Sequence, residues 1–172
     1  MIPLTKSELS EKLLDTYLAK NKDYGNSAHR TYVEFGEAAY VIRISDKFSR
    51  AKRLLSSGER MVNDESVLDT IGDAITYLFM LCADLIEDDA SADKDVRMGM
   101  TDNIDTTIKH LKSISMVDYS DYPRTPDFAE ACLTRLSEVY HSTASLAARC
   151  AEYLTLAYKL VNEYLFRSEE TK

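Results

Sequence analysis

Residues 65–86, ESVLDTIGDAITYLFMLCADLI, constrain the fold more than any other stretch of this chain. Wound as a helix, the stretch places Glu65, Asp69 and Asp73 four residues apart on one side. From Ala74 onward, however, apolar residues occupy that side as well as the opposite one. Because a helix that is apolar all round is normally buried, the sequence predicts a central helix, ending at about residue 88, that is covered on several sides.

Four further segments carry apolar residues at helical spacing, at about residues 5–21, 32–55, 98–115 and 127–166. Ser7 or Ser10, each followed by acidic residues, suits the start of the first helix, and the turn-forming sequence NKDYGNS suits its end. The last segment contains neither Gly nor Pro, and the 172-residue chain has only five Gly and three Pro. The sequence therefore predicts an all-α protein.

Composition excludes several classes of protein. The net charge of −8 argues against direct binding of DNA or RNA, which requires clustered Lys and Arg. The three cysteines are far apart in apolar helical patterns, which is typical of reduced core residues in a cytoplasmic protein. No apolar run approaches the ~18 residues of a membrane span. We expect a soluble cytoplasmic protein without a membrane partner.

The acidic residues allow two interpretations. A carboxylate stripe along a helix is most often a solvated face. However, Asp73 stands at the edge of the all-round apolar section, and Glu37 is in the centre of an apolar stripe with Glu34 one turn before it. Carboxylates that point inward from two neighbouring helices would suit a hard cation such as Mg²⁺, which takes oxygen ligands.

The basic residues of the 32–55 segment also allow two interpretations. Arg43, Arg50 and Arg53 lie on one side of the expected helix with Asp46 among them, and Lys47 is adjacent. They suit either intrahelical ion pairs or a clamp for phosphate groups. The nearby sequence KDYGNS is by itself only a turn.

Four short sequences between about residues 19 and 86 together carry a family resemblance: KNKDYGNS, EFG, VIRISDKFSR and DESVLDTIGDAITY. In order and spacing they resemble the nucleotide-modification-associated domain 1 family. That family is similar to a branch of the all-α nucleoside triphosphate pyrophosphohydrolase superfamily, which contains MazG-like enzymes. Thr70 stands where the second acidic motif of the superfamily has Glu, with Asp69 one position away.

The resemblance implies a MazG-like helical bundle within a single compact domain. Residues 1–89 would form its nucleotide-binding core, and residues 90–172 would add helices that pack on the core or on a partner subunit. It implies a Mg²⁺-dependent nucleotide-binding protein, a nucleoside triphosphate pyrophosphohydrolase of nucleotide-pool or DNA-modification metabolism, often phage-borne. The alternatives are a non-catalytic protein that binds or sequesters a nucleotide, and a helical oligomerisation module without a ligand.

The resemblance also suggests roles for individual residues. The expected metal ligands are Glu34, Asp46, Glu65, Asp69 and Asp73. The catalytic residues would be three of these, namely Glu34, Asp69 and Asp73. The nucleotide would contact Lys22, Tyr24, Asn26, Ser27, Arg43, Lys47 and Arg50.

We also expect a homodimer or homotetramer. An unbroken helix over residues 127–166 would be about 60 Å long at ~1.5 Å per residue, longer than a compact domain of this size is wide. The central helix likewise needs more cover than its neighbours in one chain would offer, and a second copy would supply it. The alternative is a bend near HSTAS, where Ser and Thr can bond back to the helix.

Overall fold

Every regular element in the described residues is a helix, which confirms the all-α prediction. The computed structural model describes residues 4–57, 64–90 and 103–170. In chain order its elements are α1 (Lys6–Tyr24), α2 (Ser27–Phe35), α3 (Ala38–Ser56), α4 (Asp64–Ala90), α6 (Asn103–Ser113), the 3₁₀ helix η1 (Tyr119–Asp121), α7 (Phe128–Tyr140) and α8 (Leu146–Glu170). The helix expected at 98–115 is α6, and the first residues of that range lie outside the described part of the chain.

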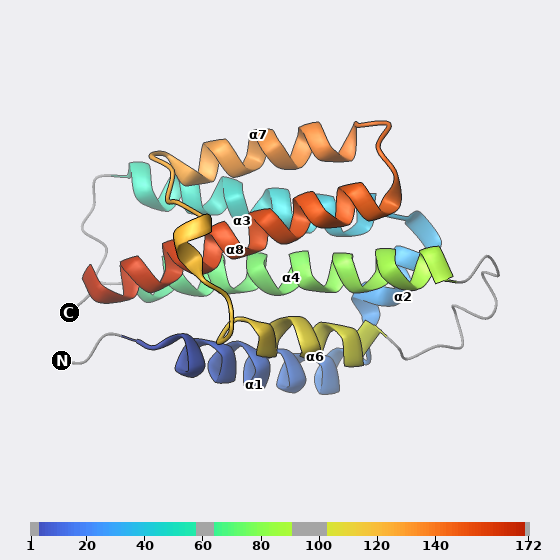
Figure 1. Ribbon diagram of the computed structural model, residues 1–172, viewed down its shortest axis with the longest axis horizontal. Helices are drawn as coiled ribbons and strands as arrows, with labels where there is room; N and C mark the ends of the chain where they lie inside the picture. The colour runs from blue at the N-terminus through green and yellow to red at the C-terminus, as the bar shows by residue number, and fades with distance from the viewer. Residues whose placement is uncertain (1–3, 58–63, 91–102, 171–172) are drawn as a thin grey trace.

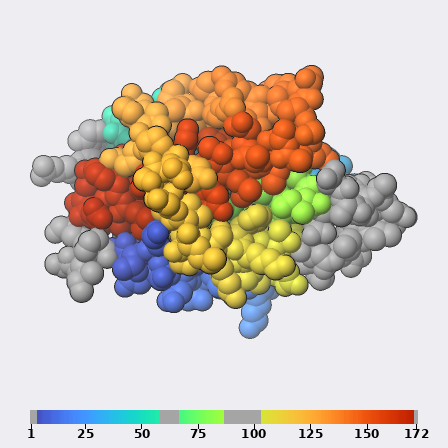
Figure 2. Space-filling view, in the orientation of Figure 1, coloured from blue at the N-terminus to red at the C-terminus, as the bar shows by residue number. Residues whose placement is uncertain are grey.

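The central helix is α4. It packs against α3, α6 and α8 and touches α1 and α2 more lightly, so that it lies between an α3–α7 layer and an α1–α6 layer (Figure 1). On the face drawn in Figure 2, α4 is visible only as a small green area. Between Ala74 and Leu85 every residue is buried except Thr76 and Tyr77, which are half-buried. Other helices of the same chain therefore cover the apolar side chains of α4 on several sides.

The first helix has caps at both ends. Thr5, and not Ser7 or Ser10, forms the capping box: its hydroxyl accepts from the backbone N–H of Glu8 at 3.2 Å, and its own N–H donates to the Glu8 carboxylate at 2.7 Å. The helix runs three residues beyond the expected end, to Tyr24. Gly25 ends it with φ of 55°, in the left-handed conformation that glycine adopts without strain.

The expected helix over residues 32–55 is two helices. It starts earlier, at Ser27, and Gly36 interrupts it with φ of 70° and ψ of −157°. That combination is essentially restricted to glycine, and it turns the chain between α2 and α3. The prediction of one continuous helix was therefore wrong at Gly36.

The expected continuous helix over residues 127–166 is also interrupted. α7 ends at Tyr140 and α8 begins at Leu146, so the bend near HSTAS is confirmed. Ser142 donates to the carbonyl of Val139 at 2.8 Å, while the hydroxyl of Ser145 accepts from the N–H of Ala148 at 3.2 Å. These short polar side chains cap the two helix ends and allow α7 and α8 to pack against each other.

The structural reasons for expecting an oligomer are removed, because helices of the same chain cover α4 and because the bend between α7 and α8 folds α8 back onto its own chain. A homodimer or homotetramer stays a prediction, which light scattering can test. Among the described residues, no helix is both long enough and apolar enough to cross a membrane.

Candidate functional site

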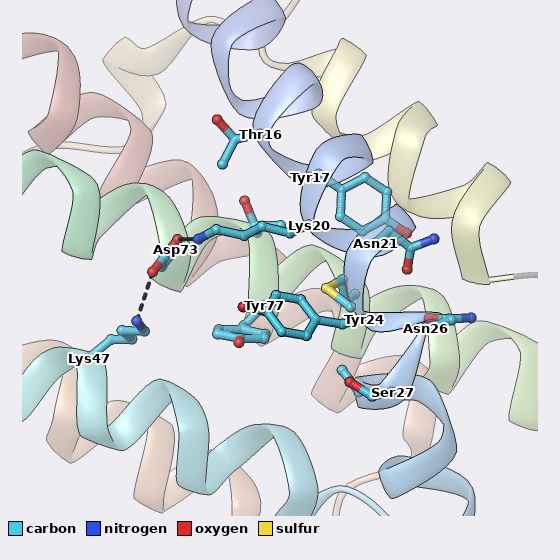
Figure 3. Close-up of a pocket in the computed structure, with 13 residues that line it drawn as sticks. Thr16, Tyr17, Lys20, Asn21, Tyr24, Asn26, Ser27, Lys47, Asp73 and Tyr77 are labelled. Carbon is cyan, nitrogen blue, oxygen red and sulfur yellow. Dashed lines mark hydrogen bonds and ion pairs between the residues drawn. The ribbon is translucent and has the colours of Figure 1, made fainter.

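A pocket of about 270 Å³ opens between α1 and α3, with residues of α4 between them. α1 contributes Lys20 and Tyr24 among others, α3 contributes Lys47, and α4 contributes Asp73 and Tyr77. The turn after α1 and the first residues of α2 complete the wall (Figure 3). Three helices that are distant in sequence thus meet at this pocket.

One end of the pocket is charged. The ammonium group of Lys20 lies 2.7 Å from Oδ1 of Asp73, and that of Lys47 lies 2.7 Å from Oδ2. Figure 3 shows the two lysines approaching different oxygens of the carboxylate. Burial by itself would raise the pKa of Asp73, but the hydrogen bonds from Lys20 and Lys47 outweigh it and hold the pKa below its ordinary value of 3.8. Asp73 is therefore ionised at neutral pH and shared by two cations.

The rest of the pocket is uncharged and partly aromatic. Tyr17 and Tyr77 contribute rings to the wall, and Tyr24 stands at the mouth with 68% of its surface exposed. Burial raises the pKa of Tyr17 to about 12, so its hydroxyl is protonated under physiological conditions. Asn21 and Asn26 add amide groups. A pocket of apolar surfaces with a few polar groups at defined places is typical of small-molecule sites.

A buried polar cluster lies behind Asn26. The carboxylate of Asp84, 1% exposed, accepts from the hydroxyl of Tyr40 at 2.6 Å and from the amide of Asn103 at 3.3 Å, and it lies 2.5 Å from Nδ1 of His29. The amide of Asn26 donates in turn to the Asn103 oxygen at 3.0 Å. The position of Asn26 in the pocket wall is therefore tied through Asn103 to a carboxylate in the core.

The sequence interpretation missed both Asp84 and Lys20. Asp84 had a visible signal, because it is the only acidic residue within the apolar run from Ala74 to Ile86. Lys20 had none, since it is one of several lysines on an amphipathic helix and its partner lies 53 positions away.

Five of the residues expected at a nucleotide site do meet in the pocket: Tyr24, Asn26, Ser27, Lys47 and Asp73. The other residues expected to contact the nucleotide do not line it. Lys22 is exposed on α1, and Arg50 is exposed on α3. Arg43 donates instead to the carbonyl of Ala39 at 2.7 Å and to the hydroxyl of Thr31 at 3.5 Å.

The expected metal ligands are spread over three helices. Glu34 is exposed near the end of α2, Asp46 is exposed on α3, and Asp69 is exposed on α4 one turn before Asp73. Glu65 is in α4, and its side chain lies outside the described part of the structure. Within that part, no group of three or more His, Cys, Asp or Glu residues could hold a metal ion.

Glu37, the inward-facing acid, has protein partners. Its carboxylate accepts from Arg149 at 2.6 and 2.9 Å and from the hydroxyl of Tyr153 at 2.7 Å. An arginine of α8 thus balances the charge for which a cation was expected. Mg²⁺ as a cofactor stays a prediction.

Comparisons of the chain with protein-family models, with curated proteins and with solved structures find no match.

Proposed function

We propose that this protein binds a phosphorylated nucleoside in the pocket between α1 and α3. The observation that carries the proposal is the convergence of Lys20 and Lys47, from different helices, on Asp73 at one end of a pocket whose other lining residues are uncharged. The whole chain carries a net charge of −8, so this pair of cations stands out as a place for an anionic group. Lysine ammonium groups bind phosphate as compact point charges.

The uncharged part of the pocket suits a nucleoside. Tyrosine rings can stack on a base, which is favourable for any base because each presents a π-face. Amides such as Asn26 can exchange hydrogen bonds with a base edge or a sugar hydroxyl. The family resemblance that we propose for residues 19–86 points to the same class of ligand.

Isothermal titration calorimetry with ribo- and deoxyribonucleotides of each base tests the proposal. At least one nucleotide should bind, and Lys47→Gln should weaken its binding by about tenfold or more, the equivalent of one charge-assisted hydrogen bond. Lys52→Gln is the matched control, because Lys52 is on the same helix but pairs with Glu130 outside the pocket. Absence of binding by every nucleotide, or equal losses in both variants, would refute the proposed site.

Hydrolysis is tested separately on the same samples. We place binding, and not turnover, in the proposal because the described carboxylates do not gather around one point. Release of pyrophosphate from a nucleoside triphosphate in the presence of Mg²⁺ would extend the proposal to the pyrophosphohydrolase activity that the resemblance implies.

A further inference from the structure

The lysine pair of the pocket has its own counter-ion. Of the described residues that line the pocket, three carry charge: Lys20, Lys47 and Asp73. Each ammonium group lies 2.7 Å from a different oxygen of the Asp73 carboxylate. The pocket therefore offers a ligand a net charge of about one positive unit and not two.

Space in the pocket is limited as well. Its volume of about 270 Å³ is just below the ~300–1,000 Å³ usual for small-molecule sites. Asp73 is half-buried, with 25% of its side chain exposed, so a phosphate that enters must share the lysines with a fixed carboxylate close by. Each further phosphate adds negative charge near that carboxylate without a further cation in the pocket wall.

The other charged residues close by on α3 and α4 do not raise the net positive charge that the pocket offers a ligand. Arg43 and Arg50 are one turn before and one turn after Lys47, but neither lines the pocket. Asp46 precedes Lys47, and Asp69 is one turn before Asp73, and both are exposed. The additional charges close by on these two helices thus include acids as well as arginines.

We propose that the pocket selects a nucleoside that carries one phosphate group over the corresponding triphosphate. The reason is that the Asp73 carboxylate competes with the phosphate groups for the two lysines and repels each additional phosphate. The inference rests on the proposed function, because it concerns the same pocket. It assigns Asp73 the role of counter-ion to the lysines, in contrast to the role of metal ligand that the resemblance implies.

Calorimetry in metal-free buffer containing EDTA tests the phosphate number. The probes are the nucleoside, its monophosphate and its triphosphate for each base. For the base that binds best, the monophosphate should bind more tightly than the triphosphate, and at least about tenfold more tightly than the nucleoside. A triphosphate that binds as tightly as the monophosphate, or more tightly, would overturn the inference while leaving nucleotide binding intact. If no probe binds, the proposed function fails and this inference fails with it.

Asp73→Asn tests the role of the carboxylate, because it removes the charge at nearly constant volume. The variant should bind both nucleotides more tightly than the parent, and the gain should be larger for the triphosphate. Circular dichroism checks that the variant is folded, and if it is not, the wild-type series decides alone. A loss of nucleotide binding in Asp73→Asn that occurs only in buffer containing Mg²⁺ would make Asp73 a metal ligand and overturn the counter-ion role.

Discussion

Replacing Tyr40 by phenylalanine tests whether the buried Asp84 depends on its hydrogen-bond donors. The Tyr40 hydroxyl donates to Asp84 at 2.6 Å, and the two residues are 0% and 1% exposed. Burial, together with the neighbouring Asp84, raises the pKa of Tyr40 well above its ordinary value, so the hydroxyl remains a donor at neutral pH. The substitution keeps the ring in place and removes only this donor, so the carboxylate keeps Asn103 and His29 as partners.

The loss of a hydrogen bond to a charged group costs about 1.5–3 kcal/mol. For a chain of this size a loss of about 2 kcal/mol lowers Tm by roughly 4–8 °C. We expect urea unfolding, followed by far-UV circular dichroism, to show a lower midpoint with an unchanged m-value.

Tyr24→Phe is the matched control for Tyr40→Phe. Tyr24 is 68% exposed, so its replacement should change the free energy of unfolding by less than about 0.5 kcal/mol. A Tyr40→Phe variant that is as stable as this control would refute the reasoning, because the buried carboxylate would then not need the donor.

Three other predictions concern the Arg149–Glu37 ion pair, Asp73 and the three cysteines. Arg149→Leu should lower the free energy of unfolding by up to about 3 kcal/mol in the same urea titration, because it leaves the Glu37 carboxylate, 12% exposed, without its cation and with only the Tyr153 hydroxyl as a donor, and adding Glu37→Gln should recover part of the loss. The pKa of Asp73 is lower in the folded protein than its ordinary value of 3.8. Its ionised carboxylate therefore stabilises the folded protein above pH 3.8, and this stabilisation is lost as the pH falls through the folded pKa. When Tm is measured at a series of pH values below about 5, it should decrease less steeply with falling pH in Asp73→Asn than in the parent. All three cysteines are buried, so Ellman's reagent should detect no thiol in native buffer and three in denaturant, and rapid reaction of the native protein would contradict the packing around α4, α7 or α8, which carry them.

Sequence reasoning found several residues of the candidate site but not the way they are joined. Asn26, Ser27, Lys47 and Asp73 were predicted as site residues, and the structure brings them to one pocket. The second cation of that pocket, Lys20, was not selected. Which lysine of α1 reaches Asp73 depends on how α1 is rotated and placed relative to α4, and a local pattern does not contain that information.

The sequence by itself determined the class of fold and the burial of α4, because a 3.6-residue apolar period and a scarcity of Gly and Pro are local properties of the chain. Only the tertiary structure decided where two of the expected helices break. Ser142 and Ser145 can sit within a helix or cap two helix ends, and packing of α7 on α3 and of α8 on α4 selects the second. The same holds for Glu37, whose partner Arg149 is 112 residues away. The apolar period of a helix indicates which of its faces is buried. Long-range packing determines which element covers that face, and therefore which residue becomes the partner of each inward-facing charge.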